Sequence, residues 1–121
     1  MKSRLTLCSV VFLSLLVPTL ALPQTKGDLK AGKAQYDTLC AACHGTSGKG
    51  DGPGAAALNP KPGNFTDCKA MAKESDATLF KIIKDGSQSV GRSPMMPAWG
   101  GALKDQQIRD LVAYIRGFCK K

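Results

Sequence analysis

The stretch Cys40-Ala41-Ala42-Cys43-His44 carries the most chemical information in this chain. Two cysteines separated by two residues and followed directly by a histidine form the attachment motif of c-type haem. On a helical turn the three side chains share one face, so both thiols can reach the porphyrin vinyl groups while the imidazole faces the iron. The motif predicts one covalent haem c, bound through Cys40 and Cys43, with His44 as an iron ligand. A redox dithiol and a zinc site are the alternatives.

A loop rich in glycine and proline follows this motif. It does not fit a phosphate-binding loop, because Lys49 is followed by glycine instead of serine or threonine. A metal-bound imidazole usually donates its second N–H to a carbonyl or carboxylate. We expect Pro53 to present a carbonyl to His44, with Pro60 and Pro62 as further candidates. The alternative is that Pro53 only shapes the turn.

The first 21 residues are typical of a secretory signal peptide. The positively charged Lys2 and Arg4 precede an apolar run from Leu5 to Val17. Thr19-Leu20-Ala21 then offers small residues at the positions that signal peptidase recognises. The run is short for a membrane span, and an uncleaved anchor is the alternative. We therefore expect a cleaved signal peptide at 1–21, one domain at 22–121 and export to the periplasm.

The chain has a basic surplus, with 17 lysines and arginines against 9 acidic residues. This balance favours acidic partner surfaces and faster encounter with them. Nucleic acid is a weaker interpretation, because aromatic residues are scarce and the lysines are scattered. Five lysines either surround a docking face or only keep the surface soluble: Lys49, Lys61, Lys69, Lys81 and Lys104.

Apolar and small residues recur at helical spacing in three segments. Capping residues mark the helix ends, namely Asp28 and Ser75 at two starts and Gly86 at one stop. No convincing strand or internal repeat is present, so we expect an all-α chain. The expected helices run from Asp28 to about Ala42, from Ser75 through Lys84 and from about Asp105 to Phe118, with short turns at 55–58 and 66–71.

The second axial position of the iron distinguishes an electron carrier from a gas- or peroxide-binding protein. Met95 and Met96 lie in a polar, glycine-rich segment, where packing alone explains a methionine poorly. Either one is a candidate ligand, and Met71 is a remote third. Ordinary core packing is the alternative for each, since methionine is a common gap-filler.

Cys68 and Cys119 have no role in haem attachment. In an oxidising compartment two remaining cysteines most simply form a disulfide. Cys119 follows Ile108 by about three helical turns, so it lies on the apolar face of the last helix and can reach inward to Cys68. Free thiols and an intermolecular bridge are the alternatives.

With these motifs in place, the chain resembles the monohaem class I cytochromes c of bacteria over nearly all of residues 22–121. Gly32 and Tyr36 stand where that family keeps a glycine and an aromatic residue in its N-terminal helix. Leu111-Val112-Ala113-Tyr114-Ile115 resembles the C-terminal helix that crosses it. Met96-Pro97-Ala98-Trp99-Gly100-Gly101 is similar to the family's axial-ligand loop, in which the ligand directly precedes proline.

The resemblance implies a cytochrome c fold with three main helices and short turns around one haem. It implies ligation by His44 and Met96, which favours Met96 over Met95. Trp99 is then expected against the haem, with its indole N–H near a propionate, and simple core burial is the alternative. Gly32 is expected to allow close approach of a second helix, because an interior glycine costs about 1 kcal/mol relative to alanine.

These observations predict a monomeric one-electron carrier, not an enzyme, that exchanges electrons with larger redox proteins. One alternative is a dedicated subunit of a membrane oxidase or a periplasmic dehydrogenase. The other is a gas- or peroxide-binding haem protein. The sequence supports that reading little, because His44 is the only histidine and none is left to act as a distal acid or base.

Overall fold

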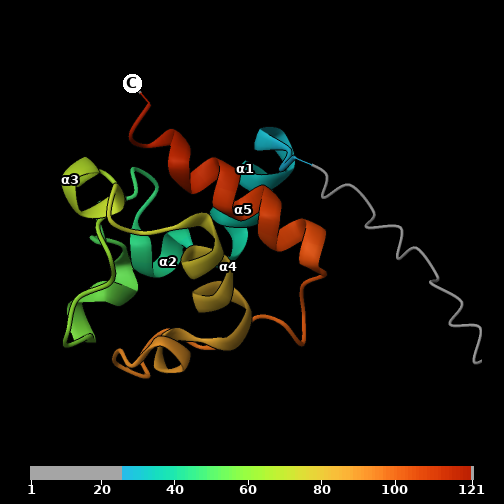
Figure 1. Ribbon diagram of the computed structural model, residues 1–121. Helices are drawn as coiled ribbons and strands as arrows, with labels where there is room; N and C mark the ends of the chain where they lie inside the picture. Colours follow the sequence, from blue (N-terminus) through green and yellow to red (C-terminus); the bar gives the residue numbers. More distant parts are fainter. Residues whose placement is uncertain (1–25, 121) are drawn as a thin grey trace, which may run out of the picture.

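The computed structural model describes residues 26–120, so the signal peptide predicted at 1–21 lies outside the described residues. Within this part the secondary structure is entirely helical, which confirms the all-α prediction (Figure 1). None of the described helices is long and apolar enough to cross a membrane. In chain order the elements are α1 (Leu29–Leu39), α2 (Ala41–His44), η1 (Pro53–Ala57), α3 (Cys68–Met71), α4 (Asp76–Asp85), η2 (Ser87–Val90) and α5 (Asp105–Gly117).

Helix α1 packs closely against α5, as the glycine in its interior predicted (Figure 1). A Cβ atom on Gly32 would lie 2.1 Å from the carbonyl oxygen of Asp110 and 2.9 Å from the Cβ of Tyr114. The predicted N-cap is also present, because the Asp28 carboxylate accepts hydrogen bonds from two backbone N–H groups of the first turn. The Asp28 N–H donates in turn to the Asp110 side chain at 2.8 Å, which joins the start of α1 to α5.

The first helix ends earlier than the sequence predicted. Instead of continuing to about Ala42, α1 stops at Leu39, and the haem motif begins the short helix α2 after a break at Cys40. Cys40 has φ −110° and ψ −35°, away from the usual helical φ of about −63°. The buried Tyr36 hydroxyl donates to the Gly45 carbonyl at 2.8 Å, so the residue after His44 is tied back to α1.

The other two long helices agree with their predicted bounds to within one residue. Ser75 caps α4 by accepting a hydrogen bond from the Thr78 N–H, and Gly86 ends α4 with φ +82°. The core lies where α5 packs against both α1 and α4, and its fully buried members are Tyr36, Ile108 and Leu111. The two predicted short turns are η1 and α3.

The structure joins Cys68 and Cys119 in a disulfide with a Cα–Cα distance of 5.4 Å. The bond links the start of α3 to the residues just after α5. It therefore closes a loop of the chain that contains α4, η2 and α5.

Candidate haem-binding site

A cavity of about 470 Å³ opens between α2, α4 and the irregular segments 58–65 and 92–99. Its volume falls in the range of about 300–1,000 Å³ that is usual for small-molecule and cofactor sites. The cavity wall is mainly apolar, as a porphyrin plate requires, and includes Leu39, Met71, Leu79, Ile82, Ile83 and Ile115.

Nearly all the predicted site residues line this one cavity. They come from two parts of the chain, one at α2 and one more than fifty residues later. The structure therefore brings together the attachment motif and the segment that contains Met95 and Met96. The members are Cys40, Cys43, His44, Met95, Met96 and Trp99.

His44 is held in a fixed orientation on α2. Its side chain is buried, with only 8% of the residue exposed, and its ring stacks on Phe65 at a centroid distance of 4.5 Å. The Nδ1 atom donates to the carbonyl oxygen of Gly63 at 3.1 Å, since a carbonyl can only accept. Burial lowers the pKa of His44, although the Gly63 carbonyl acts in the opposite direction. A neutral imidazole with Nδ1 protonated keeps the Nε2 lone pair for a metal.

The prediction that Pro53 faces His44, with Pro60 and Pro62 as further candidates, is wrong. Pro53 begins η1 instead, and the carbonyl at His44 belongs to the residue after Pro62. The cause is the path of segment 60–65 beside the glycine loop. Phe65 N–H donates to the Gly48 carbonyl at 2.7 Å, and a Cβ on Gly50 would lie 2.4 Å from the Pro62 carbonyl oxygen.

Both thiols of the motif are free and half-buried. Burial, with a smaller contribution from Cys43, raises the pKa of Cys40 to about 11. A redox dithiol needs a thiolate of lowered pKa, so this environment argues against that alternative. Across residues 26–120, no group of three or more histidine, cysteine or acidic side chains is placed to hold a metal ion, so the zinc alternative has no support there.

The candidate methionines differ in environment. Met96 is half-buried and packs against the core, whereas Met95 is 46% exposed. Met71 is buried inside the core cluster, where packing explains it. The segment after Met96 is anchored to α4, because the Trp99 and Gly100 N–H groups donate to the Ile83 and Lys84 carbonyls, both at 2.9 Å.

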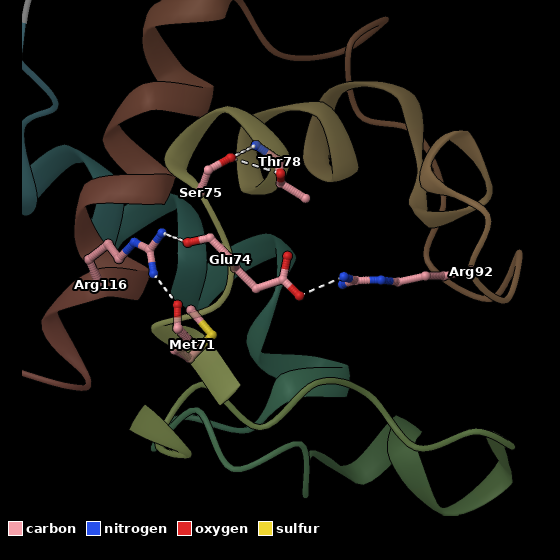
Figure 2. Close-up of polar contacts among 6 residues, drawn as sticks. All are labelled: Met71, Glu74, Ser75, Thr78, Arg92 and Arg116. Atoms are coloured by element: carbon pink, nitrogen blue, oxygen red, sulfur yellow. Dashed lines mark hydrogen bonds and ion pairs between the residues drawn. The ribbon is translucent and has the colours of Figure 1, made fainter. Parts of the chain in front are cut away.

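A charged bridge beside the cavity was not found from the sequence (Figure 2). The Arg92 guanidinium contacts the Glu74 carboxylate at 2.5 Å, and both residues line the cavity. Arg116 of α5 donates to the backbone carbonyls of Met71 and Glu74. The sequence carries no signal for this bridge, because its charges are far apart in the chain and follow no helical spacing. The stacking of Phe65 on His44 was also missed, because these two rings are far apart in the chain and follow no helical spacing.

Comparison with known proteins agrees with this geometry. A family model described as "Cytochrome c" matches residues 29–118. Cytochrome c-554(548) of Halomonas halodenitrificans is 36% identical over 88 residues, which cover 73% of this chain and 93% of that protein. A solved structure, "KustC0563 c-type cytochrome", matches with a TM-score of 0.58 and 30% identity over 74% of this chain and 98% of that one.

A longer relative matches only in part. The CcoP subunit of a cbb3-type cytochrome c oxidase from an Azospirillum species is 35% identical over 95 residues, which cover 74% of this chain. The matched region spans only 28% of that subunit, so most of the oxidase subunit has no counterpart in the comparison.

Proposed function

The chain belongs to the cytochrome c family, and from this premise we propose that it is an exported, monomeric carrier of single electrons and not an enzyme. Cys40 and Cys43 hold one haem c covalently, and His44 and Met96 are the axial ligands. The observation that supports this best is the shared cavity, whose wall includes both thiols, a buried imidazole and a half-buried methionine.

The side chains present fit this cofactor. A bound haem supplies an iron that alternates between the ferrous and ferric states. The chain provides an apolar enclosure, and the Gly63 carbonyl fixes the tautomer of His44 so that Nε2 keeps its lone pair for the iron. Stacking on Phe65 restricts rotation of the same imidazole. A ligand that is already oriented needs little rearrangement when the iron charge changes.

Trp99 has a supporting role in this proposal. It lines the cavity, and its backbone is fixed by the hydrogen bond to Ile83. We place its ring against the haem, with the indole N–H directed to a propionate. A donor of this kind would offset the desolvation of the carboxylate.

The basic surface suggests partners with acidic docking surfaces, which fits a carrier between larger redox proteins in the periplasm. Lys49, Lys69 and Lys104 are exposed. Lys61 donates to the carbonyls of Ala55 and Ala56, and Lys81 pairs with the neighbouring Asp85, so these two are partly engaged within the chain.

A second candidate is a haem-bearing subunit that works inside one redox complex. The similarity to an oxidase subunit favours it, whereas the near-complete coverage of the Halomonas cytochrome favours a separate carrier. Purification of the native holoprotein at moderate ionic strength separates the two. A free carrier elutes alone, and a subunit elutes with its larger enzyme.

The visible spectrum of the holoprotein tests the ligand set. The oxidised and reduced forms are recorded, and the reduced form is recorded again under carbon monoxide. We expect low-spin spectra that the gas leaves unchanged, because both axial positions are filled. Ready formation of a carbon monoxide adduct would mean an open or labile sixth position and would overturn the assignment of Met96.

A further inference from the structure

We infer that Ser87 is the positioning residue for Met96, because it holds segment 92–96 against the end of α4. This inference rests on the proposed function, since it takes Met96 as the sixth ligand. Ser87 is the first residue of η2, is buried with 8% exposed, and lines the cavity. A buried hydroxyl needs hydrogen-bond partners, and here the partners all lie in the methionine segment.

Each polar group of Ser87 contacts that segment. Its N–H donates to the Met96 carbonyl at 3.2 Å, and its carbonyl accepts from the Arg92 N–H at 3.1 Å. The hydroxyl donates to the Ser93 carbonyl and lies 3.4 Å from the Met96 carbonyl. The hydroxyl has one proton, and its contact with Ser93 is the shorter of the two. The Ser93 carbonyl is therefore the group that loses its hydrogen-bond donor when the Ser87 hydroxyl is removed.

The local backbone explains why Ser87 lies close to segment 92–96. Gly86 ends α4 with φ +82°, and a Cβ there would lie 3.1 Å from the Met96 carbonyl oxygen. The methionine segment therefore passes directly over the turn that carries Ser87. On the other side of Met96, hydrogen bonds from Trp99 and Gly100 to α4 fix the chain independently.

Loss of the hydroxyl should therefore loosen 92–96 and leave 99–100 in place. A partly buried carbonyl that loses its donor costs enough to change an equilibrium by about tenfold. The equilibrium affected is the one between iron-bound and released Met96, because segment 92–96 keeps its two backbone hydrogen bonds to Ser87 but loses the one from the hydroxyl. An external ligand of ferrous haem competes with Met96 and reports on that equilibrium.

The experiment is a carbon monoxide titration of the reduced holoprotein, comparing the unaltered chain with Ser87→Ala. The matched control is Ser89→Ala, which also removes a hydroxyl from η2. The Ser89 hydroxyl donates to the Gly86 carbonyl at 2.6 Å and not to the methionine segment. We expect Ser87→Ala to raise the apparent affinity for carbon monoxide about tenfold. The control should stay within about twofold of the unaltered protein.

The outcomes separate the inference from the proposed function. If the unaltered protein resists the gas and both variants resist it equally, the role of Ser87 is overturned while ligation by Met96 stands. If the unaltered protein already binds the gas readily, ligation by Met96 fails and the inference fails with it. An equal rise in both variants would show general loosening of the turn and would also overturn the inference.

A second measurement needs no variant and covers the case in which Ser87→Ala does not take up haem. Amide hydrogen exchange of the unaltered reduced holoprotein should show slow exchange of the Ser87 and Arg92 N–H groups, which donate in the two backbone contacts. Exchange as fast as that of an exposed loop amide at both positions would overturn the inference.

Discussion

His44 and Met96 line the same cavity, but the chain holds them in different ways. His44 lies on a helix, stacks on Phe65, and donates to a carbonyl of a separate segment. Met96 lies in an irregular segment that is held mainly through backbone hydrogen bonds to the end of α4 and to η2. The His44 ring is fixed by stacking and by a hydrogen bond of its own, whereas the Met96 side chain is positioned by packing against the core. We therefore expect the Met96 ligand to be released before the His44 ligand when the protein is destabilised.

Removal of each ligand in turn should give the largest difference between the two sides. We expect Met96→Ala to keep its haem, because the thioether bonds and His44 remain, and to bind carbon monoxide readily when reduced. His44→Ala removes the ligand inside the attachment motif, so we expect at least a tenfold lower yield of holoprotein. Haem content per chain and the reduced spectrum measure both effects. Equal haem loss in the two variants would show that the sides are equivalent.

The contact of α1 with α5 supports the histidine side and can be disturbed with one methyl group. Gly32→Ala places a Cβ within 2.1 Å of a backbone oxygen of Asp110, and neither helix backbone can move away cheaply. We expect the free energy of unfolding to fall by about 2–3 kcal/mol, as in other overpacked cores. Denaturant titration of the holoprotein measures this change.

Gly117→Ala is the matched control, because a Cβ at that position of α5 meets nothing within 4 Å. Alanine is the better helix former, so stability should stay level or rise by up to about 1 kcal/mol. A similar loss in both variants would place the cause outside the helix contact.

Tyr36→Phe tests the tie between α1 and the residue that follows His44. The variant keeps the ring contacts with Phe65, Tyr114 and Phe118 but loses the buried hydrogen bond to the Gly45 carbonyl. Because that carbonyl loses its donor, we expect a loss of about 1–2 kcal/mol in the free energy of unfolding, with the resistance to carbon monoxide unchanged.

The control for Tyr36→Phe is Tyr114→Phe. The Tyr114 hydroxyl makes no hydrogen bond within residues 26–120, so stability should change by less than about 0.5 kcal/mol. Increased binding of carbon monoxide by Tyr36→Phe would show that a change near His44 also loosens Met96, and would contradict the view that the two ligands are held independently.

The features that the sequence predicted depend on local patterns. The N-caps at Asp28 and Ser75, the stop at Gly86 and the reason for Gly32 all follow from residues close together in the chain or from one steric requirement. The carbonyl that faces His44 depends instead on how segment 60–65 passes the glycine loop. Proline content signals a turn but does not say which carbonyl the turn presents, so Gly63 could not be chosen over Pro53.

The weakest expected effect concerns the bridge between Glu74 and Arg92, which contacts the methionine side from the turn before α4 (Figure 2). The Arg92 side chain is half exposed to water, so the pair should contribute less than about 1 kcal/mol and should weaken with added salt. We expect Glu74→Gln to raise carbon monoxide binding by no more than about twofold at low ionic strength and to leave it unchanged at high ionic strength. Asp85→Asn removes the exposed partner of Lys81, a pair that does not line the cavity, and should have no effect at either salt concentration. A tenfold effect of Glu74→Gln would mean that the methionine segment depends on this bridge as much as on Ser87, and the difference between a buried hydroxyl and a partly exposed ion pair would not hold here.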